Sequence, residues 1–190
     1  MAIRNQLPPW HERMQLANGR EVLIRPIRPE DAEPLRASFL LLEPDEVRNG
    51  FQSSAHGLSS EDAARFAQPD PKTEFALVAA EPFAPGESLV SALVRARTLD
   101  NGTDAEFAVL VARNALNLGL GRHLLSRLAR WARGRNLQRL VGDLPQENGP
   151  ILDHADSLGF QRDTHGQSGD LIRVVLEVGA EDEAAATQAH

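Results

Sequence analysis

Two glycines, Gly119 and Gly121, stand directly before a segment whose apolar residues have helical spacing. Leucines and alanines recur three or four residues apart from Leu120 to Ala132, and arginines take the opposite side. Before the glycines lies the apolar run 105–111, short enough to be a buried strand. A glycine loop between a strand and a helix lets backbone approach a ligand closely, and the first N–H groups of the helix lack partners inside it. These residues are therefore suited to hold an anion, above all a phosphate.

The spacing of the two glycines differs from that of two other phosphate-binding motifs. A dinucleotide fingerprint requires a third glycine where this chain has Leu124, and a P-loop requires Gly-Lys-Ser/Thr. The pattern resembles the pyrophosphate loop of the GNAT superfamily, acyl-CoA-dependent N-acyltransferases with Gln/Arg-x-x-Gly-x-Gly/Ala between a strand and a helix. Leu116 stands where that family has Gln or Arg, which removes one polar contact. In the family, the backbone N–H groups of the loop do most of the binding, and any side chain is compatible with them.

The resemblance covers roughly residues 20–177. After the helix, a strand over residues 139–144 is followed by Asn148 and then by Leu-Gly-Phe at 158–160, as in GNAT chains. The stretches 76–81 and 105–111 are similar to the branch that acetylates protein lysines in bacteria. The resemblance implies an α+β, three-layer GNAT fold with a mixed central sheet of about six to seven strands flanked by helices.

The resemblance also implies acetyl-CoA as the acyl donor and indicates which residues would bind it. Main-chain groups of Val109, Leu110 and Val111 would bond the pantetheine amides, as an added strand bonds a sheet edge. The pyrophosphate would lie on the loop residues Asn117, Leu118, Gly119, Leu120, Gly121 and Arg122. Asn148, at the position of the family's Asn, either bonds the pantetheine arm or caps the next helix.

Glu106 is the candidate general base, because it is the only ionisable residue in the run 105–111. An amine acceptor such as lysine has a pKa of about 10.4, so a base must take its proton before it can attack. Burial of Glu106 would raise its pKa toward the working range. The bacterial lysine acetyltransferases that the chain resembles carry their base at this strand position. The alternatives are a Glu on the solvent face of the sheet, or one paired with a nearby Arg.

A general acid is not identified. Many GNAT enzymes use a Tyr seven residues beyond the Asn; here that position is Ala155, and the chain contains no Tyr. The thiolate, with a pKa of about 8.5, is expected to leave without help. His154 is expected to be a packing or surface residue, and His123, on the loop helix, is either a surface residue or a phosphate contact. The histidines show no metal-ligand spacing, so no metal is expected.

Composition limits the remaining possibilities. A chain of 190 residues is long enough for one domain with a real core. There are no cysteines, so the acyl group cannot pass through a protein thiol, and a cytoplasmic location is expected. A net charge of −7 argues against nucleic-acid binding and favours a cationic acceptor. No apolar run is long enough for a membrane span. The chain is expected to be a monomer or a homodimer.

The expected domain covers residues 20–178, between an N-terminal extension, 1–19, and a disordered tail, 179–190. Helices are expected from Pro29, from near Pro44 and from Ser59, and a hairpin turn at 100–102. Strands are expected at 20–28, 75–80, 89–97, 105–111, 139–144 and 170–178.

Two functions of different class follow. The first is an acetyl-CoA-dependent N-acetyltransferase that acts on a protein lysine or a small amine by direct transfer. The second is a non-catalytic GNAT-fold module that binds acyl-CoA or serves as an interaction surface, which Leu116 and the missing Tyr favour.

Overall fold

The computed structural model describes residues 9–40 and 58–178. Its elements, in chain order, are β1 (Glu12–Gln15), β2 (Glu21–Pro26), η1 (Pro29–Asp31), α1 (Ala32–Leu40), α3 (Ser60–Phe66), β3 (Glu74–Ala80), β4 (Val90–Thr98), β5 (Asp104–Val111), η2 (Arg113–Ala115), α4 (Leu120–Gly134), β6 (Arg139–Pro145), α5 (Gly149–Ser157), β7 (Gln161–Ser168) and β8 (Leu171–Glu177). The helix expected near Pro44 and the tail expected from residue 179 lie outside the described residues.

The strands form one mixed sheet in the order β1-β2-β3-β4-β5-β6-β8-β7. Neighbours are antiparallel except β5 and β6, which are parallel and joined through α4. A parallel pair needs such a crossover, and a helix is the usual means. The α+β class and the mixed sheet are confirmed, with eight strands in the described part rather than six to seven.

Two strands were not expected from the sequence. β1 belongs to the stretch interpreted as an extension, and it pairs with β2 from Glu12 opposite Ile24 to Gln15 opposite Glu21. β7 pairs with β8, so the edge of the sheet on this side is β7 and not β8, which is the last described strand in the chain. Both are edge strands, and the sequence of β1, ERMQ, has little apolar alternation to reveal it.

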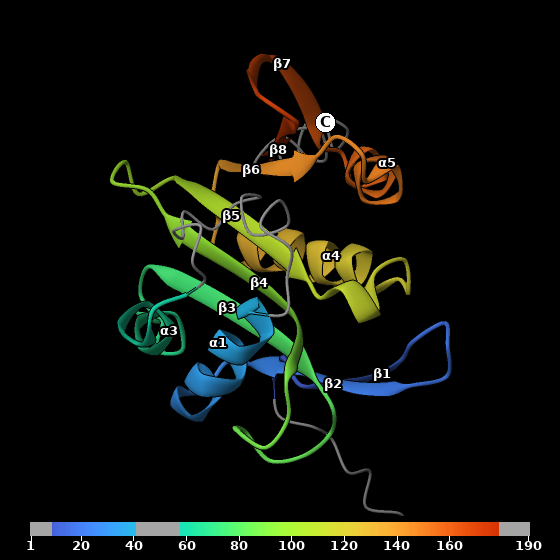
Figure 1. Ribbon diagram of the computed structural model, residues 1–190. Coiled ribbons are helices and arrows are strands. Elements are labelled where there is room, and N and C mark those ends of the chain that lie inside the picture. The colour runs from blue at the N-terminus through green and yellow to red at the C-terminus, as the bar shows by residue number, and fades with distance from the viewer. Residues whose placement is uncertain (1–8, 41–57, 179–190) are drawn as a thin grey trace, which may run out of the picture.

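The sheet has a core on each face. Figure 1 shows α1 and α3 in front of the sheet and α4 behind it. Behind, α4 buries four leucines completely, Leu120, Leu124, Leu125 and Leu128, in a cluster that includes Ile151 of α5. In front, Leu35 and Phe39 of α1 pack on β3, β4 and β5 through residues such as Val78, Leu93 and Leu110. Most residues of β3, β4 and β5 are therefore buried on both sides, as the apolar run of β5 indicated.

Candidate active site

The predicted strand, glycine loop and helix are present as β5, a loop and α4. Asn117 and Gly119 both have left-handed backbone conformations, with φ of 59° and 88°. Gly119 is the residue directly before α4, and among the described residues no side chain caps this helix end. The first N–H groups of α4 are thus left for a ligand, and the helix dipole favours an anion there. The loop geometry fits a pyrophosphate.

Gly121 lets the start of α4 pack closely against β5 and α5. A Cβ built on Gly121 would lie 3.3 Å from Val111 of β5 and 3.3 Å from Ile151 of α5. The start of α4 is therefore packed between the end of β5 and the first turn of α5. Asn148 begins that same helix, and its Oδ1 accepts a hydrogen bond from the backbone N–H of Ile151 at 3.3 Å. The expectation that Asn148 caps the helix is confirmed, and its contact with the pantetheine arm stays a prediction.

The sheet opens beside the predicted pantetheine strand. Residues 104–107 of β5 pair with residues 139–142 of β6, and the ladder ends there. Beyond this point β5 continues along β4 as far as Val111, while β6 continues along β8 as far as Pro145. Among the described strands, none pairs with the β6 side of Val109, Leu110 and Val111, so this edge can accept a ligand's amide groups. We call the divergence of β5 and β6 the strand gap.

Glu106 lies at the closed end of the strand gap, on the face of the sheet covered elsewhere by α1 and α3. Its side chain is 53% exposed, so the expected burial is wrong. Arg97, directly opposite on β4, donates from Nη2 at 2.7 Å and from Nε at 3.2 Å, both to Oε1. This hydrogen bond raises the pKa of Arg97 above its usual value. Glu106 is therefore exposed to solvent and paired with an Arg, as the two alternatives to a buried base had described.

A second carboxylate lies across the strand gap from Glu106. Val141 of β6 is opposite Glu106, and Asp143, two residues further, projects from the same face because strand side chains alternate. Arg173 of β8 bonds both oxygens of Asp143, at 2.9 and 3.0 Å, which raises the pKa of Arg173. This pair could not be predicted from the sequence, since nothing local to Asp143 indicates that a residue thirty positions later will bind it.

The two histidines considered earlier are held by protein groups. His123 Nε2 lies 2.9 Å from a carboxylate oxygen of Glu12 in β1, which also accepts from Arg127. His154 Nε2 lies 2.9 Å from Ser126 Oγ. Burial lowers the pKa of His154, and the charge of Arg122 adds to this effect. Neither ring belongs to the strands that bound the gap, and a contact of His123 with phosphate stays a prediction.

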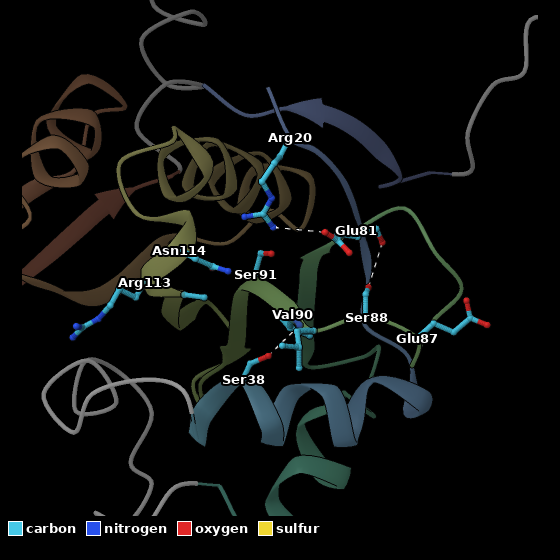
Figure 2. Close-up of a pocket in the computed structure, with 11 residues that line it drawn as sticks. Arg20, Ser38, Glu81, Glu87, Ser88, Val90, Ser91, Arg113 and Asn114 are labelled. Atoms are coloured by element: carbon cyan, nitrogen blue, oxygen red, sulfur yellow. Dashed lines mark hydrogen bonds and ion pairs between the residues drawn. The ribbon is translucent and has the colours of Figure 1, made fainter. Parts of the chain in front are cut away.

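A cavity of about 600 Å³ opens beyond the C-terminal end of β5, between η2, α1 and the start of β4. Figure 2 shows Arg20 directed toward Glu81, 3.9 Å away, and Ser38 Oγ accepting from the backbone N–H of Val90 at 3.0 Å. The cavity borders Ala112, six residues from Glu106, which is about 20 Å along a strand. Its carboxylates are therefore too distant to share a proton with Glu106.

No three or more His, Asp or Glu side chains of residues 9–40 and 58–178 come together as metal ligands would. In the same residues, no helix is both long and apolar enough to cross a bilayer.

Comparison with known proteins assigns the family. The profile of the Acetyltransferase (GNAT) family matches residues 45–160, more than half of the chain. The chain belongs to this family. It is therefore an acyltransferase, and the resemblance found in the loop, Asn148 and residues 158–160 is confirmed.

Solved GNAT structures share the fold at low identity. The GNAT domain of S. lividans PAT superposes with a TM-score of 0.72 at 22% identity, over 90% of this chain and 99% of that one. A putative phosphinothricin N-acetyltransferase superposes with a TM-score of 0.63 at 18% identity, over 83% of this chain and 98% of that one. A cAMP-binding acyltransferase from Mycobacterium smegmatis superposes with a TM-score of 0.57 at 20% identity, over 88% of this chain but 47% of that one. These likenesses establish the GNAT fold and leave the substrates open.

Proposed function

We propose that the protein transfers an acetyl group from acetyl-CoA to a primary amine, with a protein lysine as the preferred acceptor. The observation that carries this proposal is the strand gap. Its free β5 edge runs from the uncapped end of α4 to the carboxylate of Glu106. The proposed donor site and the proposed proton acceptor are thus at the two ends of one opening.

The donor would be held by backbone rather than by charged side chains. The N–H groups from Gly119 to Arg122 would bind the pyrophosphate, with the exposed Asn117 and the half-buried Leu118 forming the preceding turn. Val109 and Val111 would pair with the pantetheine amides along the free edge. Leu116 supplies no polar group, so the affinity depends on these main-chain bonds.

Glu106 would act on the acceptor. The bound donor supplies a thioester carbonyl at the closed end of the gap. Glu106 would take a proton from the acceptor's ammonium group, which frees the nitrogen lone pair for attack on the carbonyl. The C–N bond forms as the C–S bond breaks, and coenzyme A leaves as a thiolate that takes up the second proton lost by the nitrogen. Arg97 bonds only Oε1 among the described contacts, so Oε2 is left for the acceptor. The pair also fixes the direction of the carboxylate.

The charges around the gap support a cationic acceptor. Glu106 and Asp143 project from one face on the two sides of the gap, and their arginine partners lie on the outer strands β4 and β8. An ammonium group entering between them meets a carboxylate on each side, while the arginines that balance these charges lie on the outer strands. The similarity of residues 76–81 and 105–111 to bacterial lysine acetyltransferases supports a lysine in particular.

Replacement of Glu106 by glutamine tests the role of the base. We expect the turnover number to fall by about 10²- to 10⁴-fold, the usual contribution of a positioned base, with unchanged affinity for acetyl-CoA. Glu177→Gln, at an exposed glutamate of β8 on the same sheet, is the matched control and should retain full activity. Unchanged turnover of Glu106→Gln would refute the assignment.

Donor binding is tested separately by calorimetric and thermal-shift titration with acetyl-CoA, with a dinucleotide as the control. A ligand that binds only the folded state raises the melting temperature by mass action. Binding of acetyl-CoA together with acetylation of lysine peptides supports the enzyme. Binding without acetylation across a broad panel of amines would select the non-catalytic module instead.

A further inference from the structure

The closed end of the strand gap is built from one aromatic ring and one glycine. The last pair of the β5–β6 ladder joins Phe107 to Gly142. A Cβ built on Gly142 would lie 2.4 Å from Cε1 and 2.5 Å from Cζ of the Phe107 ring. The ring therefore occupies the space that any side chain at position 142 would need. It crosses from β5 to the backbone of β6 at the point where the strands part.

The ring of Phe107 is fixed in this place. It is only 6% exposed and belongs to the core cluster behind the sheet, on the face covered by α4 and α5. Phe160 packs against it edge to face, with 5.7 Å between the ring centroids. Phe160 is itself 3% exposed. The ring is thus held against Gly142 by a second buried aromatic side chain.

The position of this ring matters for the donor. The proposed pantetheine edge begins at Val111 and ends at Val109, two residues from Phe107, which is about 7 Å along a strand. An acyl group attached at the end of the pantetheine extends further in the same direction. It therefore meets the place where the ladder closes, with Phe107 beneath it and Glu106 on the opposite face.

We propose that Phe107, seated on Gly142, limits the acyl group to two carbons and so makes the protein selective for acetyl thioesters over longer acyl thioesters. This inference rests on the proposed function, because it uses the same donor edge. One extra methylene in an apolar pocket changes selectivity by roughly 10- to 200-fold. Discrimination between acetyl and butyryl donors of at least that size is expected.

The experiment uses the full chain with acetyl-CoA, propionyl-CoA and butyryl-CoA as probes. Affinity is measured by calorimetry and, where an amine is acetylated, selectivity by the ratio of kcat/KM values. The variants are Phe107→Ala and Phe107→Leu, the second for the case that the first does not fold. Phe75→Leu is the matched control, because Phe75 is also an aromatic residue of a sheet strand but stacks on Trp131, 5.0 Å away behind β3.

We expect the natural protein and Phe75→Leu to prefer acetyl-CoA, and the Phe107 variants to lose that preference at least tenfold by gaining affinity for butyryl-CoA. A folded Phe107 variant with an unchanged preference would overturn the inference and leave the proposed function intact. Equal use of acetyl-CoA and butyryl-CoA by the natural protein would also overturn the inference and leave the proposed function intact. Failure of the natural protein to bind any of the three thioesters would refute the proposed donor and this inference together.

Discussion

Replacement of Asp31 by asparagine is expected to destabilise the protein strongly, because Asp31 neutralises a buried cation. Its side chain is 1% exposed and accepts two hydrogen bonds from Arg25, at 2.7 and 2.8 Å. It also accepts from the backbone N–H groups of Arg28, at 2.8 Å, and of Gly86, at 3.3 Å. Through these four bonds it connects β2, the start of α1 and the β3–β4 loop that forms one wall of the cavity.

The magnitude follows from what the substitution leaves behind. Arg25, whose side chain is 5% exposed, would keep its charge without a counter-ion. Removing one partner of a buried ion pair costs about 3–5 kcal/mol. For a domain of this size each kcal/mol lowers the melting temperature by about 2–4 °C, so a fall of about 6–20 °C is expected. The free energy of unfolding would drop by a large part of the usual 5–15 kcal/mol.

Urea unfolding followed by tryptophan fluorescence measures this loss, since Trp131 is buried in the core. Glu33→Gln is the control, because Glu33 pairs with Arg36 on the exposed side of α1. An exposed pair contributes about 0–1 kcal/mol, so the control should unfold almost as the natural protein does. A loss below about 1 kcal/mol in Asp31→Asn would refute the reasoning.

The same residue makes stability depend on pH. Burial alone would raise the pKa of Asp31, but the hydrogen bonds from Arg25, Arg28 and Gly86 outweigh it and hold the pKa below its ordinary value. Its contribution is therefore complete above the unfolded-state pKa, about 3.9, and is lost as the pH falls through the lower folded-state value. Unfolding curves at decreasing pH should show this loss in the natural protein and not in Asp31→Asn.

Three further outcomes are expected. Gly119→Ala should weaken acetyl-CoA binding measured by calorimetry and cost about 1–2 kcal/mol in urea unfolding, because φ is 88° there. Asn148→Ala should lose about 1 kcal/mol of stability in the same assay, because its side chain caps α5 at Ile151. In an NMR titration the midpoint of His154 should fall below the ordinary value of about 6.5, because burial and Arg122 lower its pKa, and Arg122→Gln should raise it.

The strand, loop and helix around the glycines could be predicted because their signals are local. The four leucines of α4 repeat at helical spacing, and all are fully buried. The apolar run of β5 indicated burial on both faces, which the two core clusters confirm. Asn148 was also placed correctly before a helix, since Gly-Pro after it is typical of a first turn.

The surroundings of Glu106 could not be predicted, because they depend on which strands become neighbours. The apolar run suggested a buried carboxylate, yet Arg97 lies opposite it only through the register of β4 and β5. The fit of Phe107 against Gly142 is another such case, since the two residues are far apart in the chain. The cavity likewise joins segments from Arg20 to Asn114. Local patterns carry no information about such pairings.

The short parallel ladder between β5 and β6 has a mechanical consequence. It divides the sheet into two antiparallel halves, β1 to β5 and β6 with β8 and β7, each held by its own complete set of antiparallel ladders. Between the described strands of the two halves, the backbone ladder consists of the pairs from residues 104–107 to residues 139–142, and the core cluster behind the sheet contains residues of both halves. Where this ladder ends, the described strands of the two halves share no backbone hydrogen bonds, so a ligand bonded to β5 and to the start of α5 would add a second connection between them.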